Sequence, residues 1–182
     1  MKLLGISGSL RRDSYNSLLL GNVRELIDDD VELELYDALK DVPPFDEDDE
    51  SEPAPAVAHL RDAIAGADAI LFATPEYNSS IPGQLKNAVD WASRPLVTAP
   101  LRNEPVAVVG ASTGMFGGVW AQAELRKVLA STGARVLDLE LAVPLASSQF
   151  DEAGRLADDE LRARLAEVAA QVVAENAVTV AA

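Results

Sequence analysis

Short apolar runs alternate along the chain with longer segments in which apolar residues recur every three or four positions. The short runs have the continuous hydrophobicity of buried parallel strands, and the longer segments have the period of amphipathic helices. Strands are predicted at Lys2–Ile6, Val31–Tyr36, Ala69–Ala73, Pro105–Gly110 and Arg135–Leu141. Helices fit between and after them, at Ser14–Ile27, Ala56–Ala65, Pro82–Ala92, Val119–Ser131 and Asp158–Asn176. This alternation predicts an α/β fold with a doubly wound sheet of five parallel strands.

Glycine and proline mark several predicted helix boundaries. Gly66 and Gly133 follow the second and fourth helices, where a helix end often takes the left-handed conformation that glycine tolerates. Pro82 stands in the first turn of the third helix, where its missing amide costs nothing. The last residues, Thr179–Ala182, are expected to fray.

The stretch Lys40–Pro55 interrupts the alternation. It is rich in acidic residues and proline and has no periodic apolar positions. We expect a solvated connection over one end of the sheet with Phe45 as its anchor, because runs of charge usually stay in water. A substrate-side or partner-binding loop is the alternative.

Length and composition indicate one domain spanning residues 1–182. At 182 residues and 48% hydrophobic, the chain can bury one sizeable core. No apolar run reaches the roughly 20 residues that a membrane span requires, and Met1 leads directly into a strand pattern rather than a signal-like segment. We therefore expect a soluble, cytoplasmic protein without a membrane span.

The residues that are scarce exclude several kinds of chemistry. The chain has no cysteine and a single histidine, His59, so disulfides, thiolate nucleophiles and iron–sulfur clusters are excluded and no metal site is predicted. His59 falls on the second predicted helix, where a surface or packing role is expected.

The charge balance is strongly acidic. With 30 acidic and 15 basic residues, the net charge of -15 argues against duplex nucleic acid or anionic lipid as a partner. Only four of the basic residues are lysines: Lys2, Lys40, Lys86 and Lys127. This composition fits a surface adapted to high salt, and equally an ordinary acidic protein.

The loop after the first predicted strand has the composition of a phosphate site. It contains four side chains that can donate hydrogen bonds and an arginine that can donate charge-assisted ones: Ser9, Ser14, Asn16, Ser17 and Arg11. The loop leads into a helix, whose first amides and dipole favour a dianionic phosphate. Neither a Walker motif nor a dinucleotide G-x-G-x-x-G is present. The alternative is a polar helix cap at Asp13 or Ser14 without a ligand.

The loop after the third strand can recognise the edge of a flat ring. Pro75 turns the chain without an amide to pair. Glu76, Tyr77 and Asn78 then present backbone donors and acceptors, and asparagine tolerates unusual backbone angles. Tyr77 taken alone is better explained as a half-buried ring.

A glycine-rich loop follows the fourth strand. It covers Ala111–Gly118 and includes Ser112 and Gly114. Glycines allow backbone to approach a flat ligand closely, although a plain glycine-rich turn is the alternative. The carboxyl ends of parallel strands share one edge of a sheet, so the three loops together predict a phosphorylated planar ligand at a switch point of strand order.

Two motifs carry a resemblance to a known family. The stretch G-S-L-R-x-x-S-x-N-S (Gly8 to Ser17) and the longer stretch P-E-Y-N-x-S-x-P-G-x-L-K-N-A-x-D-W (Pro75 to Trp91) resemble the NAD(P)H-dependent FMN reductases. That family includes quinone and chromate reductases and related azoreductases. The resemblance covers nearly the whole chain and implies a flavodoxin-like, three-layer fold with strand order 2-1-3-4-5.

The resemblance also implies site residues. The FMN phosphate would be held by Ser9, Arg11, Ser14, Asn16 and Ser17. The isoalloxazine ring would be lined by Pro75, Glu76, Tyr77 and Asn78, and closed on its other side by Ser112 and Gly114. Pairing into a homodimer or homotetramer would use Leu85–Trp91 and Val119–Leu129. Trp120 departs from the family, which often has a basic or small residue there; Trp91 and Trp120 each fit a core or an interface role.

The implied activity is transfer of hydride from NADPH or NADH to FMN and then to a small electron acceptor such as a quinone, or the reduction of free flavin. Because the flavin carries this chemistry, no catalytic side chain is expected. A flavodoxin-type electron carrier is the runner-up, since it shares the fold, and a regulatory or structural flavin-fold module is a third possibility. The carrier is disfavoured because flavodoxins have a threonine-rich phosphate loop.

Overall fold

Parallel strands form the centre of the molecule. The computed structural model describes residues 1–180, with side chains through Asn176, so the predicted frayed end lies partly outside the described residues. The sheet order is β2-β1-β3-β4-β5, and a further strand, β6, pairs with β4. The strands are β1 Lys2–Ser7, β2 Glu32–Tyr36, β3 Ala69–Ala73, β4 Pro105–Ala111, β5 Arg135–Val136 and β6 Leu141–Val143. The predicted flavodoxin-like order is confirmed.

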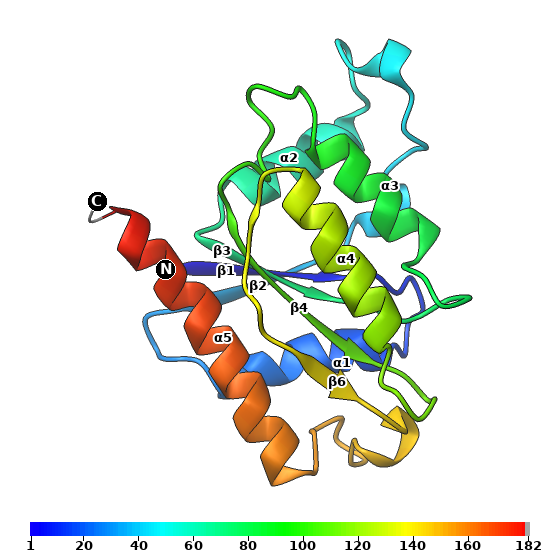
Figure 1. The fold of residues 1–182 in the computed structure, drawn as a ribbon, viewed down its shortest axis with the longest axis vertical. Helices are drawn as coiled ribbons and strands as arrows, with labels where there is room; N and C mark the ends of the chain where they lie inside the picture. Colours follow the sequence, from blue (N-terminus) through cyan, green and yellow to red (C-terminus); the bar gives the residue numbers. More distant parts are fainter. Residues whose placement is uncertain (181–182) are drawn as a thin grey trace.

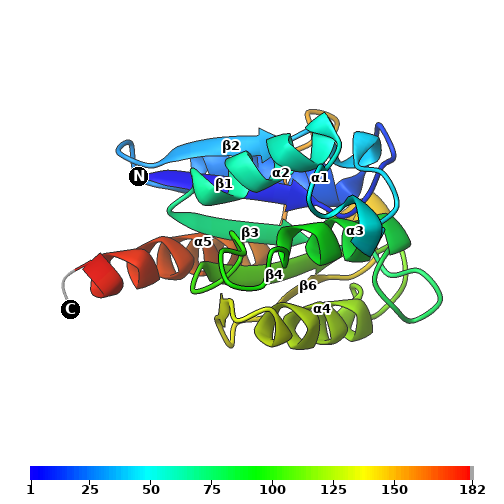
Figure 2. The ribbon, with the colours of Figure 1, turned by 90° about the horizontal axis from the view of Figure 1, so that it is seen from above.

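Helices cover both faces of this sheet and give three layers (Figures 1 and 2). The helices are α1 Tyr15–Asn22, α2 Pro55–Ala65, α3 Gly83–Ala92, α4 Val119–Ser131 and α5 Asp159–Val180. One buried cluster joins alternate strand residues to α2, α3 and α4, and the other joins the remaining strand residues to α1 and α5. Within residues 1–180, no helix combines the length and the apolarity needed to cross a membrane.

The last predicted strand, Arg135–Leu141, is wrong in its middle. The chain pairs with β4 at Arg135 and Val136, leaves the sheet, and returns as β6 against the far end of β4. Glu140 is held outside the sheet, because its carboxylate accepts from Arg126 Nη2 at 2.6 Å and its carbonyl from Arg164 Nε at 3.1 Å. The alternating apolar and polar residues of this segment imitate one continuous strand, and only these tertiary contacts divide it.

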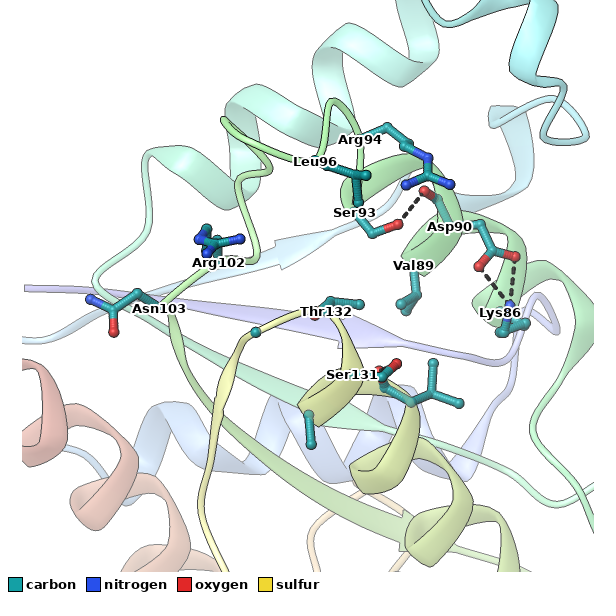
Figure 3. A pocket seen from close by; sticks show the side chains of 13 residues that line it. Lys86, Val89, Asp90, Ser93, Arg94, Leu96, Arg102, Asn103, Ser131 and Thr132 are labelled. Carbon is teal, nitrogen blue, oxygen red and sulfur yellow. Dashed lines mark hydrogen bonds and ion pairs between the residues drawn. The ribbon is translucent and has the colours of Figure 1, made fainter.

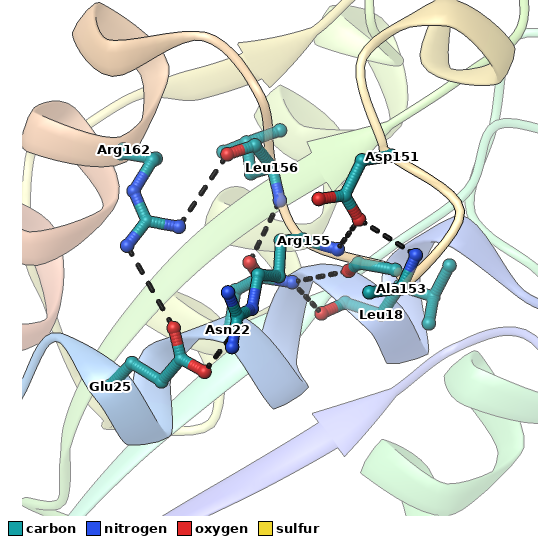
Figure 4. Close-up of polar contacts among 9 residues, drawn as sticks. Leu18, Asn22, Glu25, Asp151, Ala153, Arg155, Leu156 and Arg162 are labelled. Atoms are coloured by element: carbon teal, nitrogen blue, oxygen red, sulfur yellow. Dashed lines mark hydrogen bonds and ion pairs between the residues drawn. The ribbon is translucent and has the colours of Figure 1, made fainter.

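The first predicted helix, Ser14–Ile27, is too long at both ends. The α-helix ends at Asn22 and continues as a 3-10 turn to Glu25. Asn22 is buried, and Figure 4 shows its amide bound to the segment before α5: Nδ2 donates to Gly154 O at 2.9 Å, and Oδ1 accepts from Leu156 N at 2.8 Å. This docking of a distant loop explains why the regular helix stops there.

The two predicted helix-ending glycines differ. Gly133 has a φ of +86°, the left-handed conformation expected of it. Gly66 ends α2 with φ −88°, which any residue can adopt, so the predicted left-handed conformation at Gly66 is wrong. A side chain there would instead press on Asp62 O, 3.2 Å from an added Cβ.

The acidic connection before α2 is anchored as predicted. The ring of Phe45 packs edge-on against Trp91 with 4.9 Å between centroids. Trp91 is only 1% exposed, and its indole Nε1 donates to Pro43 O at 2.9 Å. The Trp91 ring therefore belongs to the core of the subunit, which decides between its two predicted roles.

Candidate functional site

The three predicted loops begin side by side at one edge of the sheet. Ser7 at the end of β1 pairs in register with Ala73 of β3, and Ala73 pairs with Val109 of β4. The strands therefore release their loops at nearly the same level, on the right of Figure 1. We define the first loop as residues 8–14, the second as 74–82 and the third as 112–118.

The first loop starts with a close backbone contact. Gly8 N donates to Ala73 O at 2.8 Å, and a Cβ on Gly8 would lie 2.7 Å from the side chain of Leu85 on α3. A side chain at this position would have to push aside the end of the buried Leu85 side chain. The loop is closed on its other side by Ser17 Oγ, which donates to Ser7 Oγ at 3.0 Å.

The first loop leaves several hydrogen-bond donors free. Ser14 Oγ caps α1 by accepting from Asn16 N at 3.2 Å and Ser17 N at 3.4 Å, so the predicted helix cap is present. Within the described chain, the Ser14 hydroxyl hydrogen and the amide of Tyr15 have no acceptor, and the Arg11 guanidinium, 5.7 Å from the Tyr15 ring, makes no ion pair. Hydroxyl, amide and guanidinium donors around a helix start fit a phosphate group.

Asn16 joins the first loop to the third. Its side chain is 3% exposed, and its amide makes two bonds with one residue: Nδ2 donates to Ala111 O at 3.0 Å, and Oδ1 accepts from Ala111 N at 2.9 Å. This paired contact fixes the start of α1 relative to the end of β4.

The second loop forms a tight turn at its tip. Tyr77 and Ser80 exchange backbone hydrogen bonds of 3.0 and 3.1 Å. Asn78 and Ser79 have φ values of 53° and 60°, as a type I′ turn requires. The predicted tolerance of Asn78 for unusual angles is thus used here. Pro75 is buried at the base of the loop, and the amides of Glu76 and Asn78 have no partner in the described chain.

Two carboxylates connect the second loop to α4. Glu76 Oε2 accepts from the first amides of that helix, Trp120 N at 3.1 Å and Ala121 N at 3.2 Å. In return, Glu124 on α4 accepts from Ile81 N at 3.3 Å through its own Oε2. Glu76 therefore faces α4 with its side chain and leaves its backbone to line the loop. Sequence reasoning missed Glu124, because a glutamate in a helix has no local signal for this contact.

The third loop is held against β6. Ser112 N donates to Val143 O at 3.1 Å, and Gly114 N donates to Ser112 Oγ at 3.1 Å. Gly117 has φ +59°, and a Cβ there would lie 2.7 Å from Val143 N. Glycine is therefore required at this position. The contact with β6 could not be foreseen, because the sequence pattern showed no separate strand there.

Large apolar side chains gather on the second and third loops. Tyr77, Met115 and Phe116 are exposed, and Trp120 on the first turn of α4 is 51% exposed. Phe116 and Trp120 meet edge to face with 5.0 Å between their centroids. This aromatic surface adjoins the second loop and the first turn of α4, which are joined by Glu76.

A separate hollow lies between the C-terminal ends of α3 and α4 (Figure 3). Its volume is about 730 Å³, and Lys86, Asp90, Arg102 and Thr132 are among the residues that line it. Lys86 Nζ makes an ion pair of 2.6 Å with Asp90. The parallel helices that bound it start at the edge bearing the loops and end at the opposite one, so this hollow is not part of the predicted site.

His59 is exposed on α2, as expected, and lies 5.4 Å from the ring of Tyr36. Burial, followed by the charges of Asp37 and Asp41, raises the pKa of Tyr36 to about 12. This phenol is therefore protonated throughout the physiological range.

Comparison with known proteins assigns the chain to one family. The model of the NADPH-dependent FMN reductase family matches residues 1–148. The chain belongs to this family. It is 45% identical to an NAD(P)H-dependent FMN reductase of Pseudomonas aeruginosa over 89% of this chain and 88% of that protein. It is 37% identical to a quinone reductase of Pseudomonas putida over 84% of this chain and 83% of that one.

A solved structure agrees with this family assignment. The flavoenzyme NAD(P)H:(acceptor) oxidoreductase FerB from Paracoccus denitrificans superposes with a TM-score of 0.87, at 31% identity and over 96% of both chains. The family resemblance seen in the sequence is confirmed, and with it the expectation of an oxidoreductase that uses FMN and NAD(P)H.

Proposed function

We propose that this chain is an FMN-dependent oxidoreductase that takes hydride from NADPH or NADH and passes it to a small planar acceptor such as a quinone. The observation that carries this proposal is that free hydrogen-bond donors at the first loop lie at the same sheet edge as two loops held in place by α4 and β6. Relatives described as FMN reductases and quinone reductases support the same activity.

The residues of the three loops fit FMN. The free hydroxyl of Ser14, the guanidinium of Arg11 and the amide of Tyr15 would bind its phosphate, assisted by Ser9, Asn16 and Ser17. The backbone of Pro75, Glu76, Tyr77 and Asn78 would line one side of the ring, and Ser112 and Gly114 the other. When bound, FMN supplies the hydride-accepting chemistry. The side chains on these loops would bind and orient the FMN. Glu76 holds the first turn of α4 against the second loop.

Trp120 and Phe116 provide a surface for the acceptor. Two exposed aromatic rings beside the second loop favour planar aromatic molecules, which stack or pack edge-on with such rings. We expect Trp120→Ala to raise the KM for benzoquinone several-fold while leaving the rate of flavin reduction by NADPH unchanged. A loss confined to the NADPH step would remove Trp120 from the acceptor site.

An anaerobic two-step reaction tests the activity. The FMN-loaded protein is mixed with NADPH or NADH, and benzoquinone is added after the absorbance at the flavin band has settled. The proposal predicts bleaching by the nicotinamide and recovery on addition of the quinone. Reduction by dithionite, but by neither nicotinamide, would contradict it and favour the flavodoxin-type carrier.

We also propose a homodimer or homotetramer that uses the outer surfaces of α3 and α4. The strongly exposed Leu96 and Val97 after α3 support this assembly, since exposed apolar patches mark interaction surfaces. Light scattering after gel filtration should give two or four subunits, and Leu96→Glu combined with Val97→Glu should lower that number if this surface is used. A wild-type monomer at micromolar concentration would contradict the assembly. A cytoplasmic location follows from the proposed use of NADPH or NADH.

A further inference from the structure

Gln122, in the first turn of α4, is a buried polar residue that is not among the proposed flavin-binding residues. Its side chain is 0% exposed. Nε2 donates to Gly117 O of the third loop at 3.2 Å, whereas Oε1 has no hydrogen-bond partner within the described chain. The opposite orientation of the amide would set two acceptor oxygens against each other, so Nε2 faces Gly117. An unpaired buried acceptor destabilises the folded state, so a residue that keeps one usually serves another purpose.

The backbone around Gln122 leaves room for its amide. At Gly110 on β4, an added Cβ would lie 2.7 Å from Gln122 Nε2 and 2.9 Å from Thr74 O. Gly117 and Gly118 have left-handed backbone, with φ values of 59° and 79°, so the chain turns sharply just before α4. The glutamine side chain reaches back across this turn to the carbonyl of Gly117.

The contact with Gln122 holds the end of the third loop that leads into α4. Gly117 is buried, and its carbonyl accepts no other hydrogen bond among the described residues. The start of the loop is held from the opposite direction, where Gly114 O accepts from Leu145 N at 3.0 Å. Loss of the Gln122 amide would therefore free one end of the loop and leave the other end attached.

The same turn of α4 also holds the second loop. Glu76 Oε2 accepts from the amides of Trp120 and Ala121, which directly precede Gln122. The first turn of α4 thus connects to the second loop through Glu76 and to the third loop through Gln122. A glutamine inside a helix carries no sequence signal for such a contact.

We propose that Gln122 is a positioning residue that fixes the third loop for the flavin ring. The assignment rests on the proposed function, in which Ser112 and Gly114 close one side of that ring. Gln122 does not touch the flavin; it acts through the carbonyl of Gly117. Its unpaired Oε1 follows from placing an amide donor inside the protein, where a single acceptor is within reach.

Replacement by methionine separates positioning from stability. Gln122→Met keeps the length of the side chain, removes the unpaired Oε1 and leaves Gly117 O unpaired instead. The number of unpaired buried acceptors is unchanged, so the midpoint of urea unfolding should stay close to that of wild type. Gly117 O can gain a new partner from water only if the loop moves. We expect faster amide hydrogen exchange in residues 112–118 without flavin, and affinities for FMN and riboflavin that both fall about three- to tenfold.

Gln84→Met is the matched control, because it removes the same amide from another helix. Gln84 on α3 donates from Nε2 to Leu39 O and to Val42 O, each at 2.8 Å. We expect this variant to lower the urea midpoint but to leave both the exchange of residues 112–118 and the affinity for riboflavin at their wild-type values. Gln122→Leu repeats the measurements if Gln122→Met does not fold.

The outcomes separate this proposal from the proposed function. A lower urea midpoint in Gln122→Met, with unchanged exchange and unchanged flavin affinity, would overturn the positioning role, as would failure of both Gln122 variants to fold. Faster exchange with unchanged riboflavin affinity would also overturn it, because the loop would then not serve the ring. Faster exchange in a chain whose wild type binds neither flavin would support the hold of Gln122 on the loop and refute the reductase.

Discussion

The first loop and the two loops beside it occupy the same edge of the sheet but use their polar groups differently. In the described chain, the first loop keeps a guanidinium without an ion pair and a hydroxyl hydrogen without an acceptor, and the first amide of α1 beside it also has no acceptor. The second and third loops are joined to α4 and β6, through Glu76, Glu124 and Ser112. Free donors suit the capture of a charged group, whereas a rigid backbone suits a flat ring whose edge must be met at fixed positions. Substitutions in the two regions should therefore have different effects on stability and on flavin affinity.

The largest expected effect is a loss of stability on removing the Asn16 side chain, which joins the first loop to the third. Asn16→Ala leaves both the amide and the carbonyl of Ala111 without the partner they have now. Each unsatisfied buried group costs about 1–3 kcal/mol, so the free energy of unfolding should fall by about 3 kcal/mol. Urea denaturation measures it.

The Asn16→Asp variant provides the matched control for this experiment. It keeps an acceptor for Ala111 N but loses the donor to Ala111 O, so its loss should be smaller than that of Asn16→Ala. Equal stability of Asn16→Ala and wild type would show that this contact does not connect the regions.

Loss of the Glu76 carboxylate should have a smaller effect. Glu76→Ala removes the acceptor for two amides at the start of α4, and loss of a helix cap costs about 1 kcal/mol. Because the second loop would also loosen, affinity for riboflavin, which has the ring but no phosphate, should fall together with affinity for FMN. Glu76→Gln keeps an acceptor oxygen and should recover most of both. Loss of FMN binding alone would contradict the assignment of this loop to the ring.

The smallest effect is expected at the opposite edge of the sheet. Burial raises the pKa of Glu104 above its ordinary value of 4.5, the charge of Arg135 opposes the rise, and Asp68 adds to it. The folded state therefore holds this proton more tightly than the unfolded state, so Glu104 costs stability as pH rises from 4.5 through the raised pKa.

Glu104→Gln should accordingly raise the Tm at pH 7 more than at pH 4, with no change in flavin affinity. Exposed Glu52→Gln changes the charge equally and is the control. A Tm gain that is the same at both pH values would contradict the titration of Glu104.

Much of this fold is readable from local patterns, but the contacts that shape the site are not. The alternation of buried runs and helical periods defines β3 and α4 with the bounds that the structure has, because these elements are regular and well packed. The break between β5 and β6 depends on arginines of α4 and α5 that hold Glu140. Such partners lie far away in the sequence and leave no periodic signal.

The candidate site shows the same division. Side-chain type and position identified the donors of the first loop and the unusual backbone of Asn78. They gave no indication that the carboxylate of Glu76 faces α4 or that Asn16 binds Ala111. Residues that can bind a ligand and residues that position a loop share the same chemistry, and only the tertiary structure distinguishes them.

The division of work between the loops is tested most directly by measuring how Arg11→Gln changes the binding of FMN and of riboflavin. If the first loop binds the phosphate, the variant should bind FMN about 10- to 100-fold more weakly, the equivalent of about 1.5–3 kcal/mol for a charge-assisted bond. Its affinity for riboflavin should stay at the wild-type value, and Arg11→Lys should recover part of the FMN affinity. An unchanged affinity for FMN, or equal losses for both flavins, would contradict the account.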